Sequence, residues 1–396
     1  MHVLTLNTGS SSLKFAVYDM DCTAADGRAP LHAGAVEGLG GAHVRARISD
    51  TGDARVSEID GHDHAAALEW LTHELDRAGL WRRIGAIGHR LVHGGSAYRD
   101  PVRITPAVRT ALEALVPLAP EHLHDELHAV DVMARLAPDV PQVACFDTAF
   151  HRDLPLEARW YGLPRALAEQ GVVRYGFHGL SYEYIVLALS AQGALRPRTI
   201  VAHLGNGASM AALRDGRSID TSMGLTPLGG FVMSTRSGDL DPGIMLYLLR
   251  ERSLSIDDVS AMVTTAGGLR GLSDISGDMR ELLARSGTDP RAEEAVAIFC
   301  YQVRKFLGAY VAALGGLDTL VFTGGIGEHS PVIRARICEG LDCFGIRIDA
   351  GRNDQNATSI AANGAPVAVQ VIHTNEELMI AHHTARALRS TTGGNA

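Results

Sequence analysis

The sequence predicts an α/β protein made of two related domains, and three observations lead to this prediction. The chain has 396 residues, of which 46% are hydrophobic and 20% charged, so it is long enough for two globular domains. Segments typical of strands alternate with segments typical of helices, as in α/β proteins. Two similar stretches, VLTLNTGSSS and IVAHLGNGAS, lie half a chain apart.

The chain opens with a predicted β-hairpin. Apolar residues over 3–6 and 13–18 flank the polar run 7–12, whose Gly and Ser residues predict a turn. Hydroxyls and backbone N–H groups at such a turn suit phosphate oxygens, although turns favour the same residues for conformational reasons alone. Lys14 favours the phosphate interpretation, because it is one of only two lysines among 36 basic residues and Lys acts as a compact point charge.

Later segments continue the alternation of strands and helices. Apolar residues at helical spacing predict helices, and short apolar runs that end in Gly, Asp or His predict strands. The predicted elements are a helix over 65–75, a strand within 82–95, a strand within 141–151, a strand–turn–strand unit over 197–216, a helix over 293–314, and a strand, glycine turn and helix over 318–341.

The similarity between the two halves indicates a duplication. When Gly9 is aligned with Gly207, the stretches are 207 − 9 = 198 residues apart, which is too long for a solenoid repeat. Each stretch is an apolar strand that runs into a polar, glycine-containing turn and then a second strand. Two such hairpins that face a shared cleft would suit a nucleoside triphosphate.

Composition and charge exclude several functional classes. The net charge of −9 provides no basic field for nucleic acid or a membrane surface. No apolar run approaches the roughly 18 residues of a membrane span, and no signal peptide is evident. The five cysteines are odd in number and form no CxxC motif. We therefore expect a cytoplasmic protein with reduced thiols that binds neither nucleic acid nor membrane.

Common catalytic motifs are absent from the sequence. It has no GxxxxGK[ST] P-loop, no GxGxxG that opens a helix after a strand, and no HExxH. His122, His124 and His128 are close in sequence, but no Cys or carboxylate pattern completes a zinc site. The remaining candidates are polar residues at the ends of apolar segments, each of which alone could also be a surface charge or an ion pair. They are Arg90, Asp147, His178, Arg236 and Glu376.

Nine motifs resemble those of the acetate kinase family in order and spacing. They are NTGSSSLKF, GHRLVHGG, FDTAFH, YGFHG, HLGNGAS, DTSMGLTPLGG, TRSGDLDPG, FTGGIGEHS and TNEEL, and they span residues 7–377. This family belongs to the sugar kinase, Hsp70 and actin superfamily. The resemblance therefore implies two duplicated ribonuclease-H-like (actin-like ATPase) domains around an ATP cleft. These would be residues 1–148, completed by a C-terminal helix over 377–396, and residues 149–376, in a homodimer.

The resemblance implies reversible, Mg²⁺-dependent transfer of the γ-phosphoryl group of ATP to acetate, which yields acetyl phosphate and ADP; Mn²⁺ could replace Mg²⁺. Such a transfer needs positioning and charge neutralisation. A carboxylate is ionised at neutral pH, so it can attack in line without a general base. The alternatives are a propionate or butyrate kinase, a switch-type ATPase of the Hsp70 or actin kind, and an inactive nucleotide binder. A carboxylate-holding Arg90 argues against the switch, and the complete set of polar candidates argues against the inactive binder.

The resemblance also implies a role for each motif residue. Arg90 would hold the substrate carboxylate, and His178 and Arg236 would stabilise the phosphoryl group, with Asp147 orienting the site. The implied catalytic residues are Asp147, His178 and Arg236. The implied substrate residues are Arg90, Val92, His122, Phe177 and Pro227. The implied ATP residues are Ser10, Ser12, Lys14, His203, Leu204, Gly205, Asn206, Gly207, Asp278, Met279, Arg280, Gly324, Gly325, Ile326, Gly327 and Glu328. The implied metal ligands are Asn7 and Glu376.

The sequence departs from the family pattern at several positions. Glu121 stands where relatives have a Leu that walls the acyl pocket. An acid beside an anion site is unfavourable unless it is paired, so Glu121 either turns away or alters the substrate preference. The other departures, none of which removes a residue assigned to phosphoryl transfer, are Leu180, Tyr182, Ser234 and His329.

Overall fold

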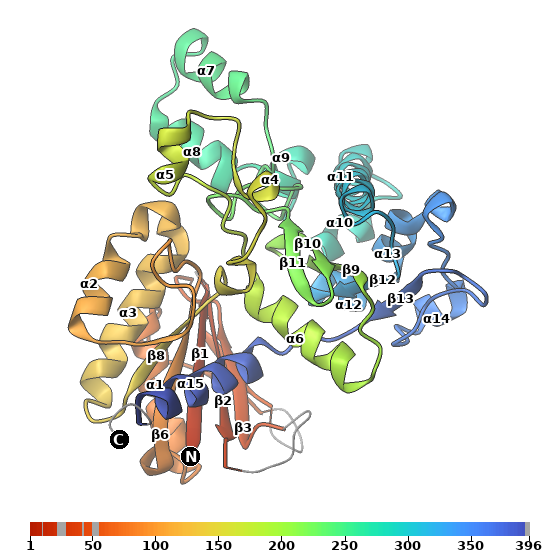
Figure 1. Cartoon of the computed structure of the whole chain (residues 1–396). Helices are drawn as coiled ribbons and strands as arrows, with labels where there is room; N and C mark the ends of the chain where they lie inside the picture. The colour runs from red at the N-terminus through yellow and green to blue at the C-terminus, as the bar shows by residue number, and fades with distance from the viewer. Residues whose placement is uncertain (10, 22–28, 42, 50–54, 393–396) are drawn as a thin grey trace. The chain divides into compact units, whose positions relative to one another are not determined.

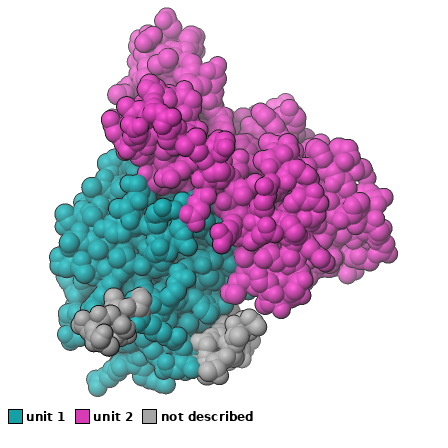
Figure 2. Space-filling model, viewed as in Figure 1, with its two compact units in different colours: residues 1–152, 179–184, 375–396 teal, residues 153–178, 185–374 magenta. Residues whose placement is uncertain are grey.

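The computed structural model describes residues 1–9, 11–21, 29–41, 43–49 and 55–392 (Figure 1). The chain forms two compact units, coloured separately in Figure 2, and each contains one mixed β-sheet. Unit 1 comprises Met1–Arg152, Gly179–Tyr184 and Asn375–Ala396, and unit 2 comprises Asp153–His178 and Ile185–Thr374. The division into domains at residues 148 and 376 stays a prediction.

Unit 1 is built on an eight-stranded sheet with the strand order β5-β4-β3-β2-β1-β6-β8-β7. Strand β1 pairs antiparallel with β2 and parallel with β6, which in turn pairs parallel with β8. The strands are β1 (His2–Gly9), β2 (Ser12–Asp19), β3 (His32–Glu37), β4 (Arg45–Ile48), β5 (Arg55–Glu58), β6 (Ile84–Leu91), β7 (Val102–Arg103) and β8 (Gln142–Phe146).

The hairpin predicted at the start of the chain is confirmed. Strands β1 and β2 are in register from His2↔Asp19 to Gly9↔Ser12, and this register places Asn7 opposite Lys14. The polar residues that the sequence singles out therefore lie at the same end of the two strands.

Helices cover both faces of the unit 1 sheet. Because successive side chains of a strand point to opposite faces, Leu4 and Leu6 of β1 join one apolar cluster and Val3 joins another. Helix α3 packs on β1 and β6 on the first face together with α1, and α15 packs on β1, β6 and β8 on the second. The helices are α1 (His64–Arg77), α2 (Pro106–Glu113), α3 (Pro120–Leu136) and α15 (Glu376–Thr392).

Unit 2 has a five-stranded sheet with the order β11-β10-β9-β12-β13. The long helix α11 (Pro290–Leu314) packs on β9 and β10, and its bounds confirm the helix predicted there. The strands are β9 (Arg198–Leu204), β10 (Ala208–Arg214), β11 (Arg217–Thr221), β12 (Thr319–Thr323) and β13 (Ala368–Val371). The other helices are α4 (Leu156–Arg159), α5 (Arg165–Glu169), α7 (Pro242–Glu251), α8 (Ile256–Thr264), α9 (Gly268–Ser273), α10 (Met279–Arg285), α12 (Gly324–His329), α13 (Pro331–Cys338) and α14 (Ala350–Asp354), while α6 (Gly179–Ala191) has residues in both units.

The two sheets repeat one topology. In unit 1 the order β3-β2-β1-β6-β8 consists of three antiparallel strands followed by two strands parallel to β1. In unit 2 the order β11-β10-β9-β12-β13 has the same sequence of directions around β9. The sequence similarity between the stretches around Gly9 and Gly207 thus corresponds to a repeated strand topology. The predicted α/β class with duplicated ribonuclease-H-like sheets is confirmed.

One predicted element is wrong in kind. The glycine run after β12 is a predicted turn, but it forms the helix α12 (Gly324–His329). Gly324 starts this helix in the left-handed region with φ 75°, where a Cβ would lie 2.8 Å from the carbonyl oxygen of Leu204. The carboxylate of Glu328 then accepts the Gly324 N–H at 2.9 Å and stabilises the first turn.

None of the helices formed by the described residues combines the length and apolar character that crossing a bilayer requires.

Candidate active site

The end of the unit 1 sheet holds a buried cluster around Arg90. Arg90 comes from β6, Asp147 directly follows β8, and Asn7 lies on β1, so parallel neighbouring strands bring the three residues together. The Arg90 guanidinium donates from Nε to both Asp147 oxygens, at 3.2 and 3.1 Å, and from Nη2 to Oδ2 at 2.5 Å. Its Nη1 donates to Oδ1 of Asn7 at 3.3 Å. Asp147 therefore orients the guanidinium from one side.

Burial controls the electrostatics of this pair. The side chain of Asp147 is 1% exposed and that of Arg90 is 14% exposed. Burial by itself lowers the pKa of Arg90, but the charges of Asp147, Glu376 and Glu126 and the hydrogen bonds that Arg90 donates to Asp147 outweigh burial and raise this pKa. Arg90 is therefore a permanent cation, held by hydrogen bonds near the end of strand β6, which is the arrangement that recognition of a carboxylate needs.

The first residues of α15 bring two carboxyl groups to the same cluster. The side-chain amide of Asn7 donates from Nδ2 to Glu376 Oε2 at 2.9 Å and to Glu377 Oε1 at 3.4 Å. Burial, followed by the neighbouring charge of Glu376, raises the pKa of Glu377, and Lys14 opposes this rise. Two adjacent carboxyls that repel each other beside an amide form an oxygen donor set, which hard divalent cations prefer. The residues present thus fit a Mg²⁺-type ion.

Glu126 is a residue of this cluster that the sequence analysis missed. Its side chain, on α3, is 1% exposed, and its Oε2 accepts the backbone N–H of Val92 at 2.8 Å. Its other oxygen, Oε1, has no hydrogen-bond partner among the described residues. Burial raises the pKa of Glu126 to about 8, although Arg90 and the Val92 N–H lower it. The signal was available, because Glu126 is three residues from Leu123 and four from Val130 on the buried face of α3.

His178 is the centre of a second cluster, within unit 2. Its Nδ1 lies 2.8 Å from the hydroxyl of Ser209, and its ring stacks on that of His203 with centroids 4.3 Å apart and planes 22° apart. His203 and Ser209 are cross-strand partners in the hairpin of β9 and β10, so this hairpin determines the orientation of the ring. Ser209 is a contact of this ring that the sequence analysis missed; its signal was a single hydroxyl among the apolar residues 208–213 of the strand.

The tip of the same hairpin brings Arg236 close to His178. A Cβ at Gly207 would lie 3.3 Å from Nε2 of His178 and 3.6 Å from Nη1 of Arg236. The same Nη1 donates to the carbonyl oxygen of Pro227 at 3.2 Å. An imidazole nitrogen and a guanidinium therefore flank one glycine, and any side chain at this position would enter the space between them.

Ser234 connects the hairpin tip to the start of α10. Its N–H donates to the carbonyl oxygen of Asn206 at 3.1 Å, and its hydroxyl donates to that of Gly277 at 2.7 Å. The next residue, Asp278, caps α10 and forms an ion pair with Arg280, whose side chain is 91% exposed. Serine at position 234 is therefore a structural connection between two predicted nucleotide segments.

The predicted site residues fall into two groups. Unit 1 contains Asn7, Ser12, Lys14, Arg90, Val92, His122, Asp147 and Glu376, and unit 2 contains Phe177, His178, His203, Leu204, Gly205, Asn206, Gly207, Pro227, Arg236, Asp278, Met279, Arg280, Gly324, Gly325, Ile326, Gly327 and Glu328. Ser10 lies outside the described residues. Met279 is 3% exposed and belongs to the buried core. Glu121 is exposed in the first turn of α3, where an acid complements the helix dipole.

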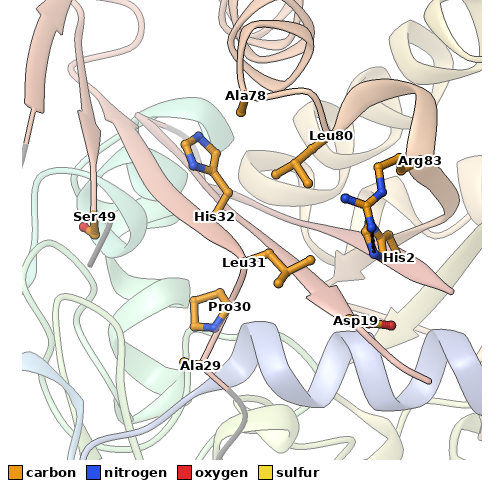
Figure 3. Close-up of a pocket in the computed structure, with 10 residues that line it drawn as sticks. All are labelled: His2, Asp19, Ala29, Pro30, Leu31, His32, Ser49, Ala78, Leu80 and Arg83. Carbon is orange, nitrogen blue, oxygen red and sulfur yellow. Dashed lines mark hydrogen bonds between the residues drawn. The ribbon is translucent and has the colours of Figure 1, made fainter. Parts of the chain in front are cut away.

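A cavity of about 580 Å³ in unit 1 is a separate feature (Figure 3). Nη2 of Arg83 lies 3.2 Å from Nε2 of His2 in its wall, and burial together with Arg83 lowers the pKa of His2. The lining residues include none of the predicted site residues. They are His2, Asp19, Ala29, Pro30, Leu31, His32, Ser49, Ala78, Leu80 and Arg83.

Comparison with known proteins identifies the family. The model of the acetokinase family matches residues 2–382. An acetate kinase of Rhodopseudomonas palustris is 44% identical over 97% of this chain and 98% of its own length, and one of Methylocella silvestris is 43% identical over 96% of both.

Solved structures agree with the sequence comparison. The crystal structure of Porphyromonas gingivalis acetate kinase has a TM-score of 0.85 at 37% identity, and covers 98% of this chain and 99% of its own. The structure of a propionate kinase from Francisella tularensis has a TM-score of 0.90 at 36% identity, and covers 97% of this chain and 99% of its own. The chain therefore belongs to the acetokinase family of enzymes.

Proposed function

We propose that this protein is an acetate kinase, which reversibly transfers the γ-phosphoryl group of ATP to acetate and yields acetyl phosphate and ADP. The observation that carries this proposal is the partly buried Arg90, oriented by Asp147 and adjacent to Asn7, in a chain whose relatives are named acetate kinases. Hydrolysis of ATP alone would need no cation of this kind to hold a carboxylate.

Arg90 would bind the acetate carboxylate through the guanidinium N–H groups that Asp147 does not use. Asp147 keeps the guanidinium in one orientation. Val92, Phe177 and Pro227 are assigned to the wall of the acyl pocket, and His122 to substrate binding. Val92 and Phe177 are apolar and are 3% and 1% exposed, respectively. Because acetate is ionised at neutral pH, its oxygen attacks the phosphorus directly and no side chain has to remove a proton.

His178 and Arg236 would stabilise the phosphoryl group during transfer. Negative charge spreads over its equatorial oxygens, and preorganised donors stabilise that charge. When the Ser209 hydroxyl donates to Nδ1 of His178, the proton of the neutral imidazole resides on Nε2, which faces the Gly207 turn beside Arg236. The imidazole N–H and the guanidinium can then donate to different oxygens of the same group.

The remaining predicted residues would bind MgATP. Ser10, Ser12, Lys14, Asn206 and Gly207 are assigned to the phosphates, and residues 278–280 and 324–328 to the nucleoside. Asn7 and Glu376 would hold Mg²⁺, or Mn²⁺ in its place, which when bound neutralises phosphate charge.

The protein is further proposed to be a cytoplasmic homodimer. Exposed apolar side chains on α7 and α8 support self-association, since such groups are costly to leave in water. They are Ile244, Leu246, Tyr247, Leu249, Ile256 and Met262, whose exposed fractions run from 36% to 77%.

A propionate kinase is the second candidate, because a structural neighbour carries that name. One methylene group changes discrimination in an apolar pocket by only about 1–3 kcal/mol. Pocket volume therefore decides between the two substrates.

The deciding experiment measures release of ADP from MgATP without acceptor and with acetate, propionate or butyrate, and traps acyl phosphate as the hydroxamate. Strong stimulation by acetate with trapped product supports the proposal. Stimulation only by a longer acid would assign a different acyl chain. Release of ADP that no acid changes, with nothing trapped, would refute carboxylate phosphorylation.

A further inference from the structure

We propose that Glu328, His329 and His373, all in unit 2, form a binding site for one divalent transition-metal ion of the Zn²⁺ type. This site is distinct from the oxygen donors proposed for Mg²⁺. Among the described residues, these three form the one group of three or more metal-binding side chains whose donor atoms all lie within 4.8 Å of one another.

One nitrogen of each histidine lies near the same carboxylate oxygen of Glu328. Oε2 of Glu328 lies 2.7 Å from Nδ1 of His373 and 3.9 Å from Nε2 of His329. The two imidazole rings have centroids 5.5 Å apart and planes inclined at 44°, so they face the same region without stacking. Both histidine side chains are about two-thirds exposed, at 66% and 67%, so an ion can enter from solvent and keep a water ligand.

The carboxylate is held in place before any ion arrives. Oε1 of Glu328 accepts hydrogen bonds from the backbone N–H of Gly324 at 2.9 Å, the Thr323 hydroxyl at 3.2 Å and the Thr374 N–H at 3.1 Å. These donors occupy Oε1 and leave Oε2 directed at the histidines. Such fixation by surrounding groups is what orients a metal ligand and raises affinity.

The donor set selects the class of metal. Two imidazoles and one carboxylate suit Zn²⁺ and neighbouring transition metals, whereas Mg²⁺ and Ca²⁺ prefer oxygen alone. With Zn–N and Zn–O bonds of about 2.0–2.2 Å, two ligands of a tetrahedral ion lie about 3.3 Å apart. The observed separations of 2.7 and 3.9 Å bracket that value. Small rotations of the two exposed imidazole rings would bring both separations to that value.

The location also suggests an effect on the enzyme, and this part rests on the proposed function. Glu328 ends the segment 324–328 that is assigned to the nucleoside. A bound ion would tie this segment to His373 and is expected to raise the KM for ATP. Metal binding itself does not depend on that assignment.

The test uses the full-length protein in excess Mg²⁺, so that hard-cation sites are filled. Binding of Zn²⁺ is followed by calorimetry, and binding of Co²⁺ by its visible absorption, which is intense only in tetrahedral sites. We expect one ion per chain with an affinity in the micromolar range. His329→Asn and His373→Asn should each weaken binding by at least roughly 10–100-fold, while unfolding temperature and activity without Zn²⁺ are retained.

His124 and His128 provide the matched control, because they are exposed and one helical turn apart on α3. The variant His124→Ala/His128→Ala should keep the Co²⁺ absorption and the affinity of the wild type. The proposal would be overturned if the wild-type protein bound no stoichiometric ion. It would also be overturned if both His→Asn variants bound the ion as tightly as the wild type does. A wild-type protein that binds Co²⁺ but does not phosphorylate any carboxylate would refute the proposed function and leave the metal site standing.

Discussion

At the scale of single residues, the environment of each charged group determines its chemical role. Asp147 and Glu126 are both fully buried carboxyls near Arg90, yet they differ in hydrogen bonding. Asp147 accepts three hydrogen bonds from the guanidinium, whereas Glu126 receives one backbone N–H and leaves one oxygen without a partner among the described residues. A carboxylate paired in this way stays charged, and an unpaired buried carboxyl tends to stay protonated.

The first prediction concerns the pH dependence that Glu126 creates. Because its pKa is raised to about 8, Glu126 is neutral at pH 7 and becomes an anion close to Arg90 at higher pH. The added charge competes with the substrate carboxylate. We expect the KM for acetate to rise roughly three- to tenfold as the pH passes through that pKa, which corresponds to about 1 kcal/mol, while kcat changes less. Steady-state kinetics across the pH range measure this.

Glu126→Gln is the control for this prediction, because it keeps the size of the side chain and cannot ionise. Its KM for acetate should stay flat above pH 8. The folded protein also binds one more proton than the unfolded chain between the ordinary Glu value of 4.5 and about 8, so wild-type stability falls as pH rises through that window. A thermal unfolding series in which wild type and variant respond equally to pH would contradict the assignment.

The second prediction concerns the hydroxyl that holds His178. Ser209→Ala removes the hydroxyl beside Nδ1 and with it one constraint on the tautomer and orientation of the ring, while the stacking on His203 is kept. We expect kcat to fall roughly 10–100-fold, with little change in the KM for acetate, since a positioning interaction of about 1.5–3 kcal/mol is lost in the transition state.

Ser218→Ala is the matched control, because Ser218 is a buried serine on the next strand, β11. It tests whether loss of any buried hydroxyl lowers kcat. If the two variants lose activity equally, Ser209 has no special role toward His178.

At the scale of elements, the close contact of β6 with α15 explains a glycine inside a strand. A Cβ at Gly88 would lie 2.2 Å from Oγ1 of Thr384 and 2.6 Å from Cγ2 of Ile380. Only glycine lets this helix approach the strand so closely. The contact keeps α15, which supplies Glu376, against the strand that supplies Arg90.

The third prediction follows from this contact. Gly88→Ala should lower the free energy of unfolding by about 1–3 kcal/mol, as overpacking typically does. Denaturant titration measures the loss. Gly287→Ala, at a position where a Cβ meets no atom within 4 Å, should change stability by less than about 0.5 kcal/mol. A neutral result for Gly88→Ala would show that α15 can move away without cost.

At the scale of the whole molecule, helices α7 and α8 of unit 2 carry exposed apolar side chains. Helix α7 is amphipathic but has no buried residue, and it exposes Leu246 and Tyr247 by 51% and 53%. An amphipathic helix with its apolar groups exposed is typical of an association surface.

The fourth prediction is that this surface mediates dimerisation. Leu246→Glu combined with Tyr247→Glu should convert the protein to a monomer, as measured by light scattering coupled to size exclusion. Thermal unfolding of the monomer should stay cooperative. Leu156→Glu, at a leucine exposed by 57% on α4, is the control and should leave the assembly unchanged. If the double variant remains dimeric, another surface forms the dimer.

The sequence by itself determined the features that local pattern encodes. Apolar spacing and turn residues predicted both hairpins and α11, and the resemblance of the motifs predicted the family. The glycine run 324–327 was predicted as a turn, because its helical start depends on the side chain of Glu328. Local propensity does not include such a contact.

Only the tertiary structure decided how the chemical groups meet. Asn7 and Glu376 are 369 residues apart in sequence but form a hydrogen bond. Likewise, the pairing of Arg90 with Asp147 and the raised pKa of Glu126 depend on which side chains exclude water around these groups. Desolvation and hydrogen-bond geometry arise from packing between distant segments, so the sequence of one segment alone does not determine them.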